Sequence, residues 1–285
     1  MALLVNFVQL STILEVESLP NSTMFVSAQL KPPLTKYLVA AFYLKFESGH
    51  SQHMIVPDGR ASILINLNED KHSILLDGAV YSSKQHIFLG LHSQAAVCTY
   101  GASTEAIILR FHPFALWSLV GIEGCNTMNH FGETSDLFKH DFETMVEQCK
   151  LLATPQLKLN LVLRYFEQKI PNSLLANPDL LTSLQSINHN KGLVTVAELT
   201  RSDAAKHKKL QRLFLKTTGM MPKVYARQVR FDNIQQHLRQ TPKPDWFQVV
   251  AHYGFTDQSH LIKEFLALTN HSPKEYINKE PGYFI

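Results

Sequence analysis

The sequence predicts an α+β protein in which a β-barrel or β-sandwich comes first and an all-helical region follows. Up to Phe111, short apolar runs separated by Gly, Ser and Asp recur at the spacing of antiparallel strands. From Phe114 the apolar residues adopt helical spacing, and beyond residue 177 the pattern is helical throughout. The length of 285 residues suits two domains of ordinary size.

The composition narrows the class of protein further. Hydrophobic residues make up 45% of the chain and charged residues 18%, which is ample for a core and excludes wholesale disorder. Three cysteines without C-x-x-C spacing exclude a disulfide scaffold and a cysteine zinc site. No apolar run approaches the ~18 residues of a membrane span, and MALLVNFVQL predicts a buried strand rather than a signal peptide. We therefore expect a soluble, cytoplasmic protein that makes no contact with a membrane.

The predicted first domain covers residues 1–140. Within it, Pro57-Asp58-Gly59 predicts a turn, and the β-branched run from Ala61 to Leu67 predicts the strand that follows. The segment FALWSLVGI predicts a short helix or buried turn. Histidines are frequent here, but His50-x-x-His53 is not the H-x-H spacing of metal ligands on one strand face. We expect no metal and no cofactor.

Residues 141–176 are predicted to hold an interdomain or dimerisation helix and a linker. Apolar residues between Asp141 and Ile170 follow helical spacing, with Pro155 near a helix start, where its missing N–H does no harm. Pro171 to Pro178 has the composition of a linker.

The third predicted unit, residues 177–285, carries strong helix-end signals. Asn177 with Pro178 predicts one helix start, and Gly192 predicts the end of that helix. Thr195 and Glu198 have the spacing of a capping box, in which the Thr side chain binds a free N–H and the Glu side chain reaches back.

The charge of this helical region differs from that of the rest of the chain. Residues 191–285 contain 15 Lys and Arg against 8 Asp and Glu, a net charge of +7. The other 190 residues carry −4, and the whole chain +3. A basic C-terminal third on an acidic body indicates a polyanionic partner, although charge alone does not decide it.

An internal repeat predicts two similar helical units. Residues 210–225 align without gaps on residues 261–276, and Leu, Phe, Thr, Pro, Lys and Tyr recur at an offset of 51 residues. Each copy follows a shorter helix and a turn, which is the helix-turn-helix pattern, and a helix from Pro222 to about Arg239 joins them. The apolar stripe is predicted to be core: Leu210, Phe214, Trp246, Phe255, Leu261 and Phe265.

The opposite faces of the repeated helices carry almost no acid. They offer amide, hydroxyl, imidazole, ammonium and guanidinium donors, which are the groups that bind phosphates and base edges. The pattern therefore favours binding of double-stranded DNA.

Two stretches, KKLQRLFLKTTGMMPKVYARQVRF and VVAHYGFTDQSHLIKEFLALTNHSPKEYI, resemble the AraC/XylS family of bacterial transcription regulators. The resemblance covers about residues 178–280. Weaker similarity around KPPLTKYLVAAFYL, HMIVPDGRASILINL and LRFHPFALWSLVGI implies a cupin-like sensor barrel at the N-terminus. The family implies an AraC-type unit of two helix-turn-helix motifs bridged by a long helix.

The resemblance also implies which side chains face DNA. It places Lys208, Gln211 and Arg212 in the groove from the first motif, and Gln258, Ser259, His260 and Lys263 from the second. Phosphate contacts are expected from Lys206, Lys216, Arg227 and Arg230, and Lys209 is a further candidate to contact DNA. The first motif departs from the family pattern, because Lys206 stands where a capping Ser is usual, and Asp203 is the candidate replacement cap.

The favoured function is a sequence-specific DNA-binding transcription regulator, controlled by a small-molecule effector or by dimerisation through the N-terminal domain. Its expected partners are promoter or operator DNA, a second copy of the chain, an effector and RNA polymerase. Arg60 and Arg110 are candidates to bind an anionic effector, and equally candidates for structural ion pairs. No motif of nucleophilic catalysis is present, so we expect no enzyme. The alternatives are a cupin-type small-molecule-binding protein or enzyme with a helical appendage, and a DNA-binding protein whose barrel only dimerises.

Overall fold

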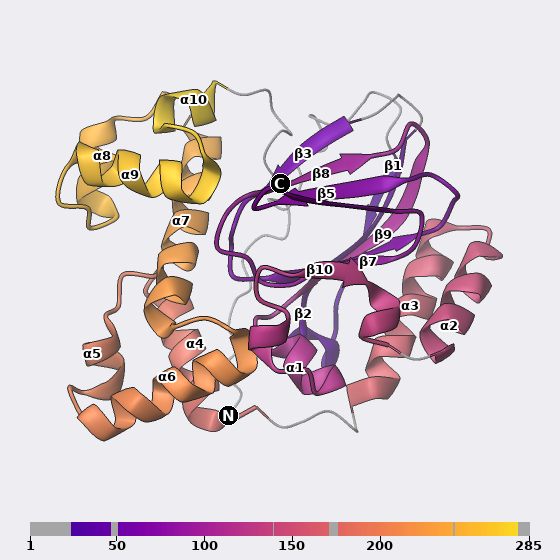
Figure 1. Cartoon of the computed structure of the whole chain (residues 1–285), viewed down its shortest axis with the longest axis horizontal. Coiled ribbons are helices and arrows are strands. Elements are labelled where there is room, and N and C mark those ends of the chain that lie inside the picture. The colour runs from indigo at the N-terminus through magenta and orange to yellow at the C-terminus, as the bar shows by residue number, and fades with distance from the viewer. Residues whose placement is uncertain (1–23, 47–50, 139, 171–175, 242, 279–285) are drawn as a thin grey trace.

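The computed structural model describes residues 24–46, 51–138, 140–170, 176–241 and 243–278. It shows a β domain followed by a helical domain, joined side by side (Figure 1). The predicted α+β class, with a β domain before an all-helical one, is therefore confirmed. The predicted strand at MALLVNFVQL lies outside the described residues, as do His50 and most of the predicted linker.

The β domain consists of two antiparallel sheets. The larger has the order β1-β2-β9-β4-β7-β10, and the smaller has the order β3-β8-β5-β6. The strands are β1 Met24–Ser27, β2 Leu38–Phe46, β3 Ser51–Ile55, β4 Ala61–Asn66, β5 His72–Leu76, β6 Ala79–Ser83, β7 Ile87–Leu89, β8 Ala96–Tyr100, β9 Thr104–Phe111 and β10 Phe131–Glu133. Short 3-10 turns lie at Leu34–Lys36, Gly124–Asn126 and Thr134–Asp136.

The larger sheet is covered on both faces, which explains its continuous apolar strands. On β9, Ile107 and Leu109 belong to one cluster with the helices, whereas Ala106 and Ile108 belong to the cluster between the two sheets. Successive strand residues point to opposite faces, so both sets of side chains must be apolar to be buried. Arg110 follows Ile108 by two residues and therefore points into the space between the sheets.

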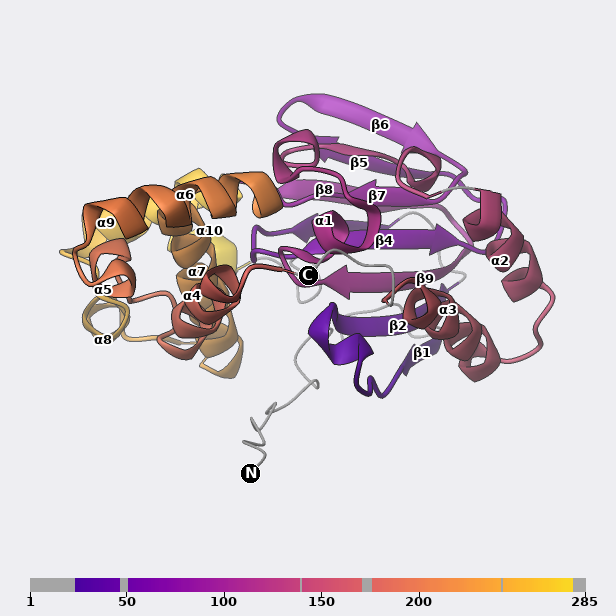
Figure 2. The same cartoon turned by 90° about the horizontal axis from the view of Figure 1, so that it is seen from below.

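Residues 141–170 form two helices rather than one. α2 (His140–Lys150) and α3 (Pro155–Lys169) pack against each other and cover the outer face of the larger sheet (Figure 2). Thr154 caps α3 by accepting a hydrogen bond from Leu157 N, with Pro155 at the first position. Since Pro155 prefers a helix start, it interrupts the helical pattern there. Phe142 and Phe166 are fully buried in the β-domain core, so this pair forms part of that domain.

The helical domain begins where the caps predict it. Asn177 caps α4 (Pro178–His189), and Gly192 follows with a φ of +75°. The remaining helices are α5 Val196–Thr200, α6 Ala204–Thr218, α7 Pro222–Gln240, α8 Trp246–His252, α9 Gln258–Thr269 and α10 Pro273–Ile277, while α1 (Ala115–Val120) belongs to the β domain. The predicted core residues of the repeat are buried, except that Trp246 is partly exposed.

The two domains share continuous apolar cores. Met54 and Val56 of the β domain cluster with Phe231 and Ile234 of α7. Two glycines permit still closer contact. A Cβ on Gly59 would lie 2.6 Å from the Tyr225 ring, and one on Gly124 would lie 2.1 Å from the backbone N of Gly219. The helical domain therefore docks firmly on the end of the β domain that carries the 57–59 turn.

Burial of neutral histidines makes the β domain sensitive to acid. The His72 side chain is fully buried, and neither ring nitrogen has a hydrogen-bond partner among the described residues. Burial lowers the pKa of His72 from 6.5 to about 4. Because the unfolded chain binds this proton more readily, the stability contributed by neutral His72 is complete above pH 6.5 and is lost as pH falls toward 4.

We predict that His72→Leu reduces this loss of stability. The free energy of unfolding of the parent should fall more between pH 7 and pH 5 than that of the variant, by about 1–2 kcal/mol. Urea unfolding at the two pH values measures the difference, with the exposed His189→Gln variant as the control. Equal pH dependence in all three proteins would contradict the assignment.

Candidate nucleic-acid interface

The first helix-turn-helix motif consists of α5 and α6. The predicted capping box of α5 is present, with Thr195 and Glu198 bonded reciprocally. Arg201 and Ser202 both have positive φ and make the turn, and Asp203 then accepts hydrogen bonds from Ala205 N and Lys206 N at 2.9 Å. Asp203 is thus the cap of α6, as predicted, and replaces the Ser that the family pattern leads one to expect.

The second motif consists of α8 and α9 and has the same construction. Asp245 caps α8, Gly254 makes the turn with a φ of +65°, and Asp257 accepts from His260 N at 2.8 Å. One of the free N–H groups at the start of α9, that of His260, is thereby satisfied.

Thr218 and Thr269, which correspond in the two copies of the repeat, have a structural role. Thr218 donates to Phe214 O at 2.8 Å and accepts from Met220 N, which closes α6. Thr269 makes the same pair of bonds at the end of α9, to Phe265 O at 2.8 Å and from His271 N. The two helices therefore end in the same geometry, and Gly219 and Asn270 both adopt the left-handed conformation there.

α7 holds the two motifs apart. Its 19 residues make it about 28 Å long. α6 and α9 lie near its opposite ends (Figure 1). Successive turns of the DNA major groove on one face are about 34 Å apart, which is of the same order as the length of α7.

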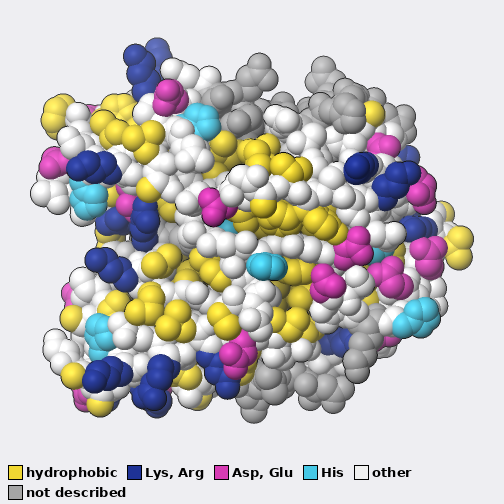
Figure 3. Space-filling model, viewed as in Figure 1, with side chains coloured by type: hydrophobic (Ala, Val, Ile, Leu, Met, Phe, Trp, Pro, Cys, Tyr) yellow, Lys and Arg dark blue, Asp and Glu magenta, His cyan; other side chains and the backbone are white. Residues whose placement is uncertain are grey.

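The outward faces of α6 and α9 remain exposed. On α6 the exposed predicted residues are Lys206, Lys208, Lys209, Arg212 and Lys216, and Gln211 is partly exposed; on α9 they are Gln258, Ser259, His260 and Lys263. Lys and Arg side chains gather over the helical domain on the left of Figure 3, and Asp and Glu are more frequent over the β domain on the right. The charge asymmetry of the sequence is thus also an asymmetry in space.

Some predicted residues have partners within the protein. Lys209 Nζ lies 2.6 Å from Asp179 Oδ2, and Gln211 Nε2 lies 2.9 Å from His207 Nε2. The His260 ring packs edge-on against Phe255, with its Nδ1 3.5 Å from the Thr256 hydroxyl. These contacts orient the side chains and leave them at the surface.

Arg227 and Arg230, which the sequence predicts as phosphate contacts, make structural contacts within the protein. Arg227 Nε and Arg230 Nη2 lie 2.8 Å and 3.3 Å from Glu264 Oε1, and the Arg230 guanidinium stacks over Phe255. These contacts tie α7 to the buried carboxylate of α9. The side chain of Arg227 is 35% exposed and that of Arg230 is 18% exposed, so Arg227 is the better placed of the two to reach a phosphate.

Three exposed apolar residues were missed in the sequence. Leu215, Ile262 and Leu266 are 42%, 41% and 44% exposed on the outward faces of α6 and α9. The predicted apolar stripe did not include them, and no role was predicted for them. Ile262 and Leu266 lie on the opposite side of the helix from the buried Leu261, Phe265 and Leu268, and this periodicity identifies them as outward-facing.

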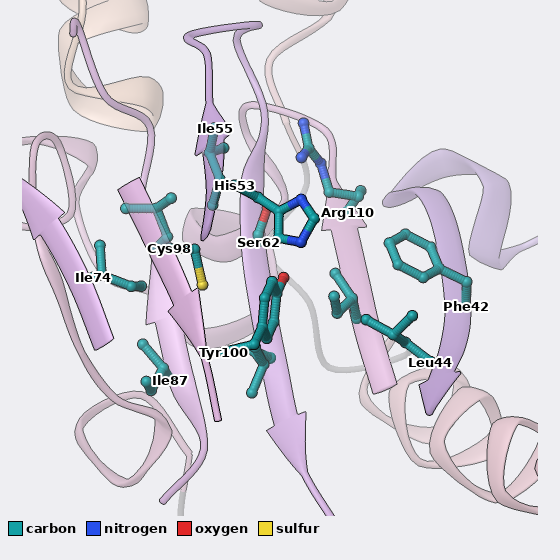
Figure 4. Close-up of a pocket in the computed structure, with 13 residues that line it drawn as sticks. Phe42, Leu44, His53, Ile55, Ser62, Ile74, Ile87, Cys98, Tyr100 and Arg110 are labelled. Atoms are coloured by element: carbon teal, nitrogen blue, oxygen red, sulfur yellow. The ribbon is translucent and has the colours of Figure 1, made fainter. Parts of the chain in front are cut away.

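A pocket lies between the two β sheets. Its walls are apolar, from Phe42, Leu44, Ile74 and Ile87 among others, and enclose a cavity of about 50 Å³. Figure 4 shows the Tyr100 hydroxyl pointing toward His53, with Arg110 beside that ring. Arg110 Nε is buried and has no hydrogen-bond partner within the described residues. Burial raises the pKa of Cys98, also in the wall, to about 12, so at neutral pH it is a thiol rather than a nucleophilic thiolate.

Arg110 also takes part in a charge cluster between the two domains. Asp58 accepts from both Arg110 Nη2 and Arg60 Nη1, the latter at 2.9 Å, and Arg60 Nη2 lies 3.3 Å from Asp232 of α7. Burial would raise the pKa of Asp58, but the neighbouring charges of Arg110 and Arg60 hold it below its ordinary value. Asp58 is therefore a carboxylate at neutral pH. Of the two roles considered for Arg60 and Arg110, the structural ion pair is the one observed.

Comparisons with known proteins agree with this architecture. A family model described as "Helix-turn-helix domain" matches residues 201–279, and another, "Domain of unknown function (DUF6597)", matches residues 28–131. No match was found among curated proteins. Within the described chain, no helix is long and apolar enough to cross a membrane, and no cluster of His, Cys, Asp and Glu has the arrangement of a metal site.

Among solved structures, ToxT from Vibrio cholerae is similar over 90% of this chain and 98% of its own, with 9% identity and a TM-score of 0.44. ToxT bound to (E)-4-(8-methylnaphthalen-1-yl)but-3-enoic acid matches with the same coverage, 12% identity and a TM-score of 0.43. The cupin domain of Schizosaccharomyces pombe Cnp3 covers 31% of this chain and 61% of its own, with 13% identity and a TM-score of 0.23.

Two capped helices with donor-rich outward faces, held on one long helix, define a double helix-turn-helix DNA-binding protein. The helix-turn-helix match over residues 201–279 confirms the helix-turn-helix unit predicted from the sequence, and together with the resemblance to the AraC/XylS family it supports a DNA-binding transcription regulator of that kind.

We predict that Asp58→Asn destabilises the full chain. Arg110 would then lose its carboxylate at a buried interface and Arg60 would keep only Asp232, and breaking such a buried pair costs about 3 kcal/mol or more. Urea unfolding at pH 7 measures the effect. Asp77→Asn, at an exposed turn with a φ of +50°, is the matched control and should be neutral. If Asp58→Asn unfolds at the same urea concentration as the parent, the cluster makes no net contribution.

Proposed function

We propose that this regulator binds promoter DNA through both motifs, with α6 and α9 in successive turns of the major groove. The observation that carries the proposal is the pair of exposed, acid-poor helix faces at the two ends of α7. On α6, Arg212 is suited to guanine, Gln211 to adenine, and Lys206, Lys208, Lys209 and Lys216 to phosphates. On α9, Gln258, Ser259, His260 and Lys263 are the proposed contacts. Arg227 is a further phosphate contact, and Arg230 mainly positions α9.

We predict different effects from the two helices. Lys208→Ala should weaken binding to all sequences alike. It should also reduce the slope of log binding constant against log salt concentration by about one, because one phosphate contact is lost. Arg212→Ala should cost about 1–3 kcal/mol and relax base preference at one position. Gln258→Ala and Lys263→Ala test α9 in the same way. Binding to a fragment from upstream of the protein's own gene is measured at about 150–200 mM salt.

Leu151→Ala is the control, because Leu151 is an exposed residue of the β domain. If all four variants of α6 and α9 bind as well as the parent, the assignment of these residues is wrong. Failure of the parent itself to bind any DNA above its non-specific level would reject the proposed function and favour the alternative of a cupin-type binding protein or enzyme.

The β domain is proposed to bind a small anionic effector with an apolar body. The pocket is walled by aliphatic and aromatic side chains, and the guanidinium of Arg110 at its edge retains a buried N–H without a partner. A carboxylate would satisfy that N–H, while its apolar part would fill the space between the sheets. Dimerisation and contact with RNA polymerase remain predictions from the sequence.

We predict that short monocarboxylates raise the melting temperature of the protein more than matched alcohols do. Hexanoate and benzoate should stabilise, whereas hexanol and benzyl alcohol at equal concentration should not, because only the acids carry a charge for Arg110. Thermal shift measures both series. Ser62→Leu, which fills the pocket, should abolish the difference, and equal shifts with acids and alcohols would contradict an anion site.

A further inference from the structure

The outward stripe of α9 differs in chemistry from that of α6. Residues at i, i+3, i+4 and i+7 share one side of a helix, and opposite the buried face of α9 these are Ser259, Ile262, Lys263 and Leu266. The equivalent stripe of α6, 51 residues earlier, is Lys208, Gln211, Arg212 and Leu215. Half of the α9 stripe is therefore apolar, whereas three of the four positions on α6 are polar or charged.

The apolar residues of this stripe are not part of the protein core. Ile262 is 41% exposed and Leu266 is 44% exposed in the full chain, with the β domain in place. The residues that hold α9 in the fold are Leu261, Phe265 and Leu268, each no more than 1% exposed. Ile262 and Leu266 lie one helical turn apart, next to Lys263, so an approaching polyanion would meet all three side chains together.

Major-groove chemistry supplies a specific partner for such side chains. The C5-methyl group of thymine is the one apolar group that the groove edge of a base pair presents. Gln258 and His260 lie at the sides of the stripe, and His260 contacts Phe255 and Thr256 of its own turn. The side chains that would lie deepest in the groove are therefore those of Ile262 and Leu266.

We propose that α9 recognises thymine through Ile262 and Leu266, which pack on thymine methyl groups in one half of the DNA site. This inference rests on the proposed DNA-binding function and gives α9 a base preference distinct from that of α6. The half-site under α9 contains thymine at one or two fixed positions, and the half-site under α6 is read by Arg212 and Gln211 through hydrogen bonds.

The experiment removes single methyl groups from the DNA. Full-length protein first enriches its preferred sites from a pool of random duplexes at about 150 mM salt. Each thymine of the enriched site is then replaced by deoxyuridine, which keeps every Watson–Crick and groove hydrogen bond and lacks only the methyl group. Affinities are measured for the parent, Ile262→Ala, Leu266→Ala, Lys263→Ala and Leu151→Ala, after thermal melting has shown that each is folded.

The parent should bind about fourfold more weakly when one or two particular thymines are replaced, the effect expected for one buried methyl group. Ile262→Ala or Leu266→Ala should bind the thymine and deoxyuridine forms equally. Lys263→Ala should weaken both forms alike, and Leu151→Ala, an exposed leucine of the β domain, should behave as the parent.

Two results would overturn the inference alone. One is an enriched site in which no thymine methyl affects affinity. The other is an undiminished methyl effect in both Ile262→Ala and Leu266→Ala, which would assign the methyl contact to other side chains and leave these residues free for a protein partner. A pool that yields no enriched sequence would instead reject sequence-specific DNA binding, and the inference with it.

Discussion

The arrangement of the two domains depends on the carboxylate of Asp58. Its side chain is 9% exposed and accepts from two arginines, one of which also reaches Asp232 on α7. Burying one carboxylate and two guanidinium groups is costly, and the cost is offset only when every charge has a partner in good geometry. Separation of the domains would break the Arg60–Asp232 contact and expose Met54, Val56 and Phe231 to water. The cluster therefore fixes one docking geometry as well as adding attraction.

The helix-turn-helix domain was the more predictable part of the chain because its constraints are local. Caps such as Asn177 and Thr195 act within three residues, so spacing alone revealed them. The division of residues 141–170 into α2 and α3 was harder to predict. Pro155 indicated that one helix starts near it, but nothing in the sequence indicated that a separate helix precedes it. Contacts between residues far apart in the sequence could not be predicted. Nothing near Asp58 in the sequence indicates that it lies close to Asp232, which is 174 positions away.

In the candidate site, too, some features follow from the local sequence and others depend on how distant segments pack. Lysines and arginines on α6 could be predicted from charge and periodicity, and the structure leaves them exposed. Arg230 was selected for its charge, but its position against Glu264 and Phe255 depends on how α9 packs on α7. Nothing in the sequence was a reason to select Leu266. In an apolar helix, an exposed leucine cannot be told from a core leucine until the buried face of the helix is known.

α7 gives the molecule a direct route between its pocket and its DNA-binding helices. One face of α7 meets the β domain through Tyr225, Gln228 and Asp232, and Gln228 Nε2 donates to His92 O at 2.8 Å. The same helix binds α9 through Arg227. Arg110 lines the pocket and bonds to Asp58, which also accepts from Arg60, the residue that reaches Asp232 of α7. An effector would change DNA binding only to the extent that it favoured one docking geometry over another, and Arg110 is the pocket residue connected to the domain interface through Asp58.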